Sequence, residues 1–405
     1  MFAGGTPDRS VARYWDSGTI PWLSSGEVNQ WLIESPTTYI TEEGMANSSA
    51  TWIPSGSIVV ALAGQGKTKG TVAQLAFAAT CNQSLAAIIP SSRVHARYLL
   101  WWLAGHYETL RNLAGGEQRD GLNLEIIGSV PCPLPPIATQ TAIADFLDAE
   151  TAQIDSVIEK LRALLLRETE RFQSAIFSLV CGFSVDGPRR SSGLAWQSAM
   201  PKTWQVRKLA WDYEIQLGKM LNPAAATGLD QRPYLANRDV QWDRVEVDSL
   251  SEMSFDDEER EHLRLRRGDL LVCEGGEVGR AAIWMDELPE CYYQKAIHRL
   301  RPRREANPRF LMYCLWAAAS RGVFAVEGNV STVMHLTGEQ LAAHRFPFPS
   351  TNEQASIVAT LDQANKRWRK VTDFMTRQIE LLQERRRALI GGTVTGQIPI
   401  TGIAA

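Results

Sequence analysis

The fold is decided by two stretches: PLPPIATQTAIADFLD at residues 133–148 and PFPSTNEQASIVATLD at residues 347–362. Each stretch opens with closely spaced prolines, which end the element before them. Each then enters a long segment without proline or glycine, at 137–181 and 350–390. Segments of this kind predict two helices that are much longer than the helices of an ordinary globular domain.

Both predicted helices carry apolar residues at alternating steps of four and three, which is the spacing of a coiled coil. These positions, named here the seam, are Ile143, Leu147, Ile154, Val157 and Leu161 in the first helix, and Ile357, Leu361, Trp368, Val371 and Met375 in the second. We expect the two helices to pair along this seam in antiparallel fashion. The alternative is that each helix packs only on its own domain.

The chain also repeats itself over nearly its whole length. Pro21 and Val28 correspond to Pro233 and Val240, with 212 positions between the members of each pair. From Pro133 onward the spacing becomes 214 and stays constant. A register held for this distance indicates a real duplication, with each half made of one domain followed by one helix.

The repeat and the helices together predict an α+β chain in which two tandem domains are separated by a pair of long antiparallel coiled-coil helices, with pseudo-two-fold symmetry. The expected segments are 1–135 (first domain), 136–182 (first helix), 183–199 (linker), 200–348 (second domain) and 349–405 (second helix and tail). A counterpart of Trp204 would fall before Met1, so we expect the first domain to lack the edge element that begins there.

Composition excludes several classes of protein. With 44% apolar residues and a net charge of −3 over 405 residues, the chain is predicted to form packed cores, unlike a disordered chain. No apolar run approaches the roughly 20 residues of a membrane span, and no secretory signal opens the chain. Six scattered cysteines favour a reducing compartment, so we expect a cytoplasmic protein without membrane contact. The net charge does not decide whether the chain binds nucleic acid, because Arg264, Arg266 and Arg267 still form a local basic cluster.

Several motifs resemble the DNA-specificity subunits of type I restriction–modification enzymes. Gly4-Gly5-Thr6-Pro7, Tyr14-Trp15 and the segment 18–28 are similar to the opening of a target-recognition domain of that family. The stretches 135–148 and 349–362 resemble the repeats that open its spacer helices. The resemblance implies that each domain reads one half of a bipartite double-stranded DNA target and that the helices set the gap.

The resemblance also implies which partners the chain has. Two methyltransferase subunits would dock on the helices and bind S-adenosylmethionine, and restriction subunits would join them to cleave DNA. This chain would then have no cofactor, no metal and no catalytic residue of its own. Two other interpretations stay open: a scaffold that binds only protein, and a single-chain DNA-modifying enzyme.

The candidate DNA-binding residues lie in loops that follow predicted strands. The glycine loops place Gln65, Lys67, Lys69 and Arg280 where backbone can approach DNA closely, and the loops after the Pro-x-Leu motifs add Ser24, Ser25, Glu27, Asn237 and Arg238. The alternative is that these loops are ordinary turns with solvated side chains. Residues 61–68 also fit a relaxed phosphate-loop pattern, but no helix start follows them, which argues against nucleotide hydrolysis.

Overall fold

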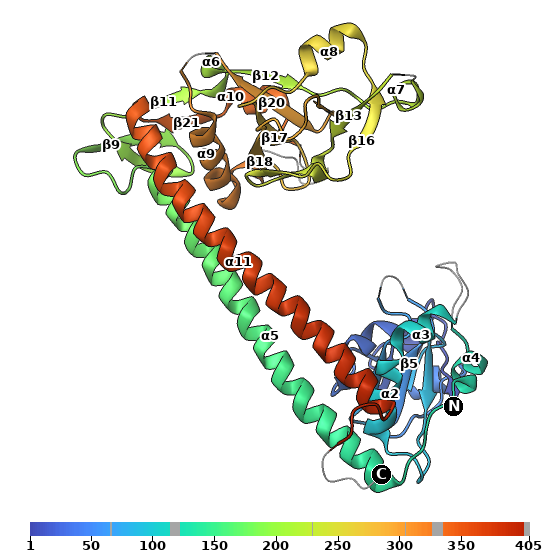
Figure 1. Ribbon diagram of the computed structural model, residues 1–405. Coiled ribbons are helices and arrows are strands. Elements are labelled where there is room, and N and C mark those ends of the chain that lie inside the picture. Colours follow the sequence, from blue (N-terminus) through green and yellow to red (C-terminus); the bar gives the residue numbers. More distant parts are fainter. Residues whose placement is uncertain (65–66, 114–121, 229, 304, 326–334, 401–405) are drawn as a thin grey trace. The chain divides into compact units, whose positions relative to one another are not determined.

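The computed structural model describes the chain except for residues 65–66, 114–121, 229, 304, 326–334 and 401–405. The chain divides into two compact units. The first comprises Met1–Arg162 with Thr376–Ala405, and the second comprises Ala163–Met375. Each unit contains one body of mixed sheet and short helices together with parts of two long helices (Figure 1).

The body of the first unit is built on two small sheets. Its strands are β1 (Phe2–Ala3), β2 (Ile20–Leu23), β3 (Leu32–Ile33), β4 (Thr38–Ile40), β5 (Ile58–Ala61), β6 (Val72–Leu75), β7 (Thr80–Cys81) and β8 (Leu85–Ile88). Its short helices are η1 (Ala12–Tyr14), η2 (Ser25–Asn29), α1 (Glu42–Ala46), α2 (Ala96–Gly105), α3 (Tyr107–Asn112) and α4 (Leu124–Ser129). The strand orders are β1-β8-β5-β6-β3 and β4-β2-β7.

Strand β5 lies at the centre of this body because both of its faces are apolar. Ile58 and Val60 belong to the apolar cluster that includes α2, whereas Val59 and Ala61 belong to a second cluster on the other face. All four side chains are buried. Successive side chains of a strand point to opposite faces, so the continuous apolar run predicted from the sequence supplies both clusters at once.

The body of the second unit has more strands than that of the first among the described residues. They are β9 (Arg189–Leu194), β10 (Gln197–Pro201), β11 (Gln205–Lys208), β12 (Tyr213–Leu217), β13 (Gln231–Leu235), β14 (Val240–Gln241), β15 (Arg244–Val245), β16 (Ser251–Ser254), β17 (Leu270–Cys273), β18 (Ala281–Ile283), β19 (Tyr292–Tyr293), β20 (Ile297–Pro302) and β21 (Arg345–Phe348). The short helices are α6 (Leu209–Asp212), α7 (Pro223–Thr227), η3 (Asn237–Asp239), α8 (Asp257–Leu263), α9 (Pro308–Ser320), η4 (Val323–Ala325) and α10 (Gly338–Ala343).

The duplication is visible in the sheet topology. The order β12-β20-β17-β18 in the second unit repeats β1-β8-β5-β6 in the first, and β16-β13-β19 repeats β4-β2-β7. Even the parallel pairings correspond, because Trp22 faces Thr80 in one copy and Tyr234 faces Tyr292 in the other. The second unit adds three two-stranded pairs: β10-β9, β11-β21 and β14-β15.

Two helices of 44 residues each, α5 (Ile137–Val180) and α11 (Thr351–Val394), follow the proline-rich entries as expected. Both begin in the same way: the side-chain amide of Gln140 donates to the carbonyl of Pro135, and that of Gln354 donates to Pro349. These bonds satisfy backbone carbonyls just before each helix, where the prolines offer no N–H groups.

The helices pair in antiparallel fashion, as the contacts inside each unit show. In the first unit, Ile143 and Leu147 near the start of α5 share a cluster with Ile390 and Val394 at the end of α11. In the second unit, Phe172 of α5 stacks on Trp368 of α11 with ring centroids 4.8 Å apart. Trp368 also meets Trp316 of α9 edge-on, so this seam residue contacts both the other helix and the body of the second unit.

The seam register differs from the predicted one at Val157. Val157 is 44% exposed, while its neighbour Ile158 is 4% exposed. The buried positions run through Leu147, Thr151, Ile154 and Ile158, because the polar Thr151 occupies a seam position. Its hydroxyl donates to the carbonyl of Leu147 at 2.6 Å, so burial leaves no unsatisfied group. A seam that is predicted from hydrophobicity alone therefore omits a buried threonine such as Thr151.

The remaining predicted seam residues lie as follows. Ile143, Leu147, Ile154, Ile357 and Leu361 are buried, and Leu161, Trp368, Val371 and Met375 are half-buried. The position equivalent to Ile158 in α11 is Thr372, which is also buried and donates its hydroxyl to the carbonyl of Trp368 at 3.0 Å. Thr372 is therefore a buried polar residue of α11 at a position where α5 has the apolar Ile158.

Candidate nucleic-acid interface

The loop after β2 is shaped from the inside by Glu27. Its carboxylate is buried and accepts hydrogen bonds from the backbone N–H of Ser24 at 2.6 Å and from the N–H and hydroxyl of Thr37 at 2.9 and 2.8 Å. These bonds occupy the carboxylate inside the loop and fix its shape, and the contact of Glu27 with DNA stays a prediction. Ser24 and Ser25 are half-buried on the same turn and stay predictions as DNA contacts.

The second copy uses an aspartate for the same purpose. Asp239 is buried, and its carboxylate accepts from the backbone N–H of Ala236 at 2.7 Å. A shorter acid thus closes the equivalent turn, η3. Next to it, the side chain of Arg238 is 70% exposed and donates to the hydroxyl of Ser251 at 3.2 Å. Arg238 is therefore the cation that this turn presents at the surface.

The glycine loop of the first unit lies against α3. The carbonyl of Lys67 accepts from the hydroxyl of Tyr107 at 2.6 Å, and that of Lys69 accepts from the guanidinium of Arg111 at 3.2 Å. Lys67 is exposed, whereas Lys69 is buried where the loop packs against α3. Both stay predictions as DNA contacts. Gln65 lies outside the described residues.

In the second unit the structure brings the two predicted loops together. The side-chain amide of Asn237 donates to the carbonyl of Gly275 at 2.9 Å, and the guanidinium of Arg280 donates to the carbonyl of Asn237 at 2.7 Å. The side chain of Arg280 is only 14% exposed and lies 3.7 Å from the carboxylate of Glu277. Arg280 and Asn237 therefore hold the loops to each other, and both stay predictions as DNA contacts.

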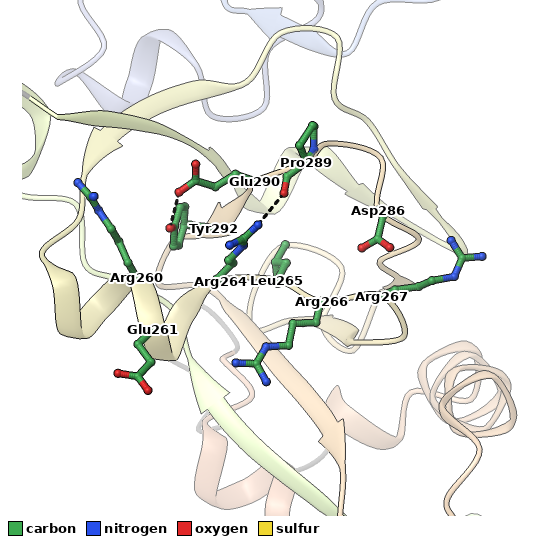
Figure 2. Close-up of a pocket in the computed structure, with 10 residues that line it drawn as sticks. All are labelled: Arg260, Glu261, Arg264, Leu265, Arg266, Arg267, Asp286, Pro289, Glu290 and Tyr292. Atoms are coloured by element: carbon green, nitrogen blue, oxygen red, sulfur yellow. Dashed lines mark hydrogen bonds between the residues drawn. The ribbon is translucent and has the colours of Figure 1, made fainter.

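A basic pocket of about 540 Å³ lies at the end of α8 (Figure 2). Four arginines line it together with the segment before β19: Arg260, Arg264, Arg266 and Arg267. Arg264 donates to the carbonyl of Pro289 at 3.0 Å, and Arg267 donates to that of Met285 at 2.8 Å. Figure 2 shows the guanidinium groups pointing in different directions rather than converging on one point. Positive charge spread in this way suits an extended polyanion better than a single small anion.

Some polar side chains of this pocket are already paired. The hydroxyl of Tyr292 donates to the carboxylate of Glu290 at 2.7 Å, and Arg260 pairs with Asp230. Burial is the main cause that raises the pKa of Tyr292 to about 12, and this hydrogen bond raises it further. The phenol therefore stays protonated near neutral pH. The sequence indicated this pocket through its density of arginines, although it did not place the arginines around a cavity.

The sequence did not indicate a second, smaller pocket of about 300 Å³ in the first unit. Arg9, Trp15, Trp22, Ser24 and Thr38 line it. These residues come from the first loop, the end of η1, β2 with the turn after it, and β4. The one available signal was the adjacency of Arg9 and Trp15 to the Gly-Gly-Thr-Pro motif, and nothing in that motif showed that Trp22 lies beside them.

Among the described residues, no group of three or more histidine, cysteine or acidic side chains could hold a metal ion. None of the helices built from those residues combines the length and apolarity that a bilayer crossing requires. The six cysteines are free thiols, and burial raises the pKa of Cys132, the least buried of them, to about 11.

Two duplicated α+β bodies, each joined to an antiparallel helix pair and each presenting basic loops, define a class of two-domain adaptor proteins. Residues 2–165 and 201–373 match the family described as the type I restriction modification DNA specificity domain. The two matches cover most of the chain, which therefore belongs to this family.

The chain is also similar to individual relatives and solved structures. The chain is 28% identical over 183 residues to the type I restriction enzyme EcoR124I/EcoR124II specificity subunit of Escherichia coli, a match that spans 44% of this chain and 45% of that relative. A chain from a solved type I R-M system shares its fold, with a TM-score of 0.64, 16% identity and coverage of 98% of this chain and 96% of that one. The HsdS subunit from Thermoanaerobacter tengcongensis is 15% identical, covers 94% and 91% and has a TM-score of 0.44.

Proposed function

We propose that this chain is the DNA-specificity subunit of a type I restriction–modification complex. Each recognition body reads one half of a bipartite double-stranded DNA sequence, and the paired helices set the gap between the halves. The observation that carries the proposal is the tandem match of both bodies to a DNA-specificity domain, each body being continuous with a long helix. The spread of arginines around α8 supplies the charge that contact with a DNA backbone needs.

The chemistry belongs to partner subunits in this proposal. Two methyltransferase subunits dock on the helices and bind S-adenosylmethionine, and restriction subunits join them where DNA is cleaved. Exposed apolar side chains on both helices support the docking, since a partner subunit can bury them: Val157, Leu164 and Leu166 on α5, and Phe374 and Leu381 on α11. Phe374 is 63% exposed and Leu166 is 60% exposed. Action in the cytoplasm stays a prediction.

The test is genome-wide sequencing of modified bases in cells with and without this gene, together with its partner methyltransferase gene. A methylated motif in two parts with a fixed gap, lost with this gene, is the expected result. Unchanged methylation in an otherwise active complex would contradict the proposal and favour a scaffold that binds only protein. Methylation by the purified chain alone would instead favour a single-chain enzyme.

A further inference from the structure

The small pocket of the first unit presents one cation on an aromatic support. The guanidinium carbon of Arg9 lies 5.7 Å from the ring centroid of Trp15 and 5.7 Å from that of Trp22. The two indoles meet edge to face with centroids 5.1 Å apart. Arg9 is exposed, and among the described residues the structure gives its guanidinium no carboxylate partner. Contact with aromatic faces holds the guanidinium while leaving its N–H donors available.

The loop that carries Arg9 is held in place from several sides. The indole N–H of Trp22 donates to the carbonyl of Gly5 at 2.9 Å, and that of Trp15 donates to the carbonyl of Asp8 at 3.0 Å. The carboxylate of Asp8 in turn accepts from the backbone N–H and hydroxyl of Ser10 at 2.9 and 2.7 Å. A Cβ at Gly5 would lie 2.4 Å from the backbone of Ser49, so the base of the loop packs closely on the body.

Resting on the function proposed above, we propose that Arg9 reads a guanine in the half-site recognised by the first body. An arginine fork matches the two acceptors, O6 and N7, that guanine presents in the major groove. A guanidinium already ordered by two indoles loses little further freedom when it binds. Ser24 and Thr38 line the same pocket and place hydroxyl groups beside the guanidinium, where they can bond the neighbouring base edge or phosphate.

The second body has no arginine equivalent to Arg9. The proposed reading of a guanine is therefore confined to one half of the target. Gly4 and Gly218 are equivalent, because their backbone N–H groups donate to the carbonyls of Leu85 and Ile297, which lie at corresponding positions of β8 and β20. Counting onward from these glycines, the position of Arg9 is taken by Pro223, the first residue of α7. Proline has no side-chain donor, so the second body must read its half-site by other groups.

The experiment selects DNA from a library of random duplexes with the full-length chain assembled with its methyltransferase subunits. The variants are Arg9→Ala and Arg9→Lys, and the matched control is Arg13→Ala. Arg13 is also exposed and also lies over an aromatic ring, that of Tyr14, but it pairs with Glu43 at 2.9 Å. Thermal unfolding and co-purification with the methyltransferase establish that each variant is folded and assembled.

We expect the complex without substitutions to enrich a bipartite motif with a guanine at one position of one half. Arg9→Ala should lower the preference for that guanine by about 5- to 100-fold, Arg9→Lys should lower it less, and the other half should not change. Arg13→Ala should leave the whole motif unchanged. An unaltered motif with Arg9→Ala overturns the inference, as does a uniform loss of affinity for all sequences, which is the signature of a phosphate contact. If the complex without substitutions enriches no motif, the proposed function fails first.

Discussion

The guanidinium of Arg97 lies 2.6 Å from the carboxylate of Asp148 and thereby joins α2 of the first recognition body to α5. Trp101 donates its indole N–H to the same carboxylate at 2.8 Å. The second copy repeats this arrangement: Arg309 lies 2.5 Å from Asp362, and the hydroxyl of Tyr313 donates to that carboxylate at 2.7 Å. The duplication has therefore kept the contact that orients each body on the helix of its own unit.

Asp148→Asn should destabilise the first unit, because Arg97 and Trp101 lose a charged acceptor in a partly buried place. We expect the free energy of unfolding, measured by urea denaturation, to fall by about 1–3 kcal/mol. Glu159→Gln is the matched control, since Glu159 pairs with Arg162 on the exposed surface of the same helix. That change should cost about 0.5 kcal/mol or less, and equal effects of the two variants would contradict the assignment.

Asp243 has a comparable role in the second unit. Its carboxylate lies 2.8 Å from the guanidinium of Arg309 and 3.6 Å from that of Arg369, and it accepts from the amide of Asn365 at 2.5 Å. Its backbone is left-handed, with φ of 53°, a conformation that asparagine tolerates. Asp243→Asn therefore tests the charge without adding backbone strain. We expect a loss of about 2–3 kcal/mol in unfolding free energy, and a neutral result would show that the arginines find other acceptors.

The second unit should become less stable as the pH is lowered, because of His298. Its ring is buried and faces the carbonyl of Leu336 at 2.8 Å, and burial lowers its pKa despite the nearby carboxylate of Glu274. The folded state then favours neutral imidazole, so the unfolded state binds more protons as pH drops below about 6.5. Full stability is present above that pH, and below it we expect a loss of up to about 1.4 kcal/mol per pH unit.

The measurement for this prediction is thermal unfolding between pH 5 and pH 8. His298→Gln should flatten the pH dependence, because a glutamine can still donate to Leu336 but does not titrate in this range. His262→Gln serves as the control, since His262 is an exposed histidine on α8. A pH dependence that survives in His298→Gln would assign the effect to other groups.

Docking of the methyltransferase should depend on the exposed apolar side chains of the helices. Phe374→Ser and Leu166→Ser should each reduce co-purification of the methyltransferase subunit at least several-fold, because they remove apolar area from the contact. Trp211→Ser is the control, since Trp211 is a similarly exposed aromatic residue on α6. Unchanged capture by both helix variants would place the partner on another surface.

Shortening both helices should change the gap of the target and leave its halves unchanged. Removing seven residues from each keeps the seam in register and shortens each helix by about 10 Å, which corresponds to about three base pairs. The check is the methylated motif of the shortened complex. The same motif with an unaltered gap would show that the helices do not measure DNA.

Sequence reasoning predicted the helices and the duplication because both depend on features that one chain displays directly: the prolines at 133–136 and 347–349, and a constant spacing between repeated residues. It failed where a polar residue acts inside the fold. Thr151 lies on the seam because its hydroxyl finds a backbone acceptor, and Glu27 is buried because backbone donors surround it. The position of Arg9 depends on Trp22, which folding alone brings beside it.

The repeated contact of Arg97 with Asp148 and of Arg309 with Asp362 has a consequence for the exchange of recognition bodies. A recognition body from another chain that has the equivalent arginine could form the same ion pair with the aspartate of the helix. We therefore expect that exchange of one whole body changes one half of the target and re-forms this contact with the helix.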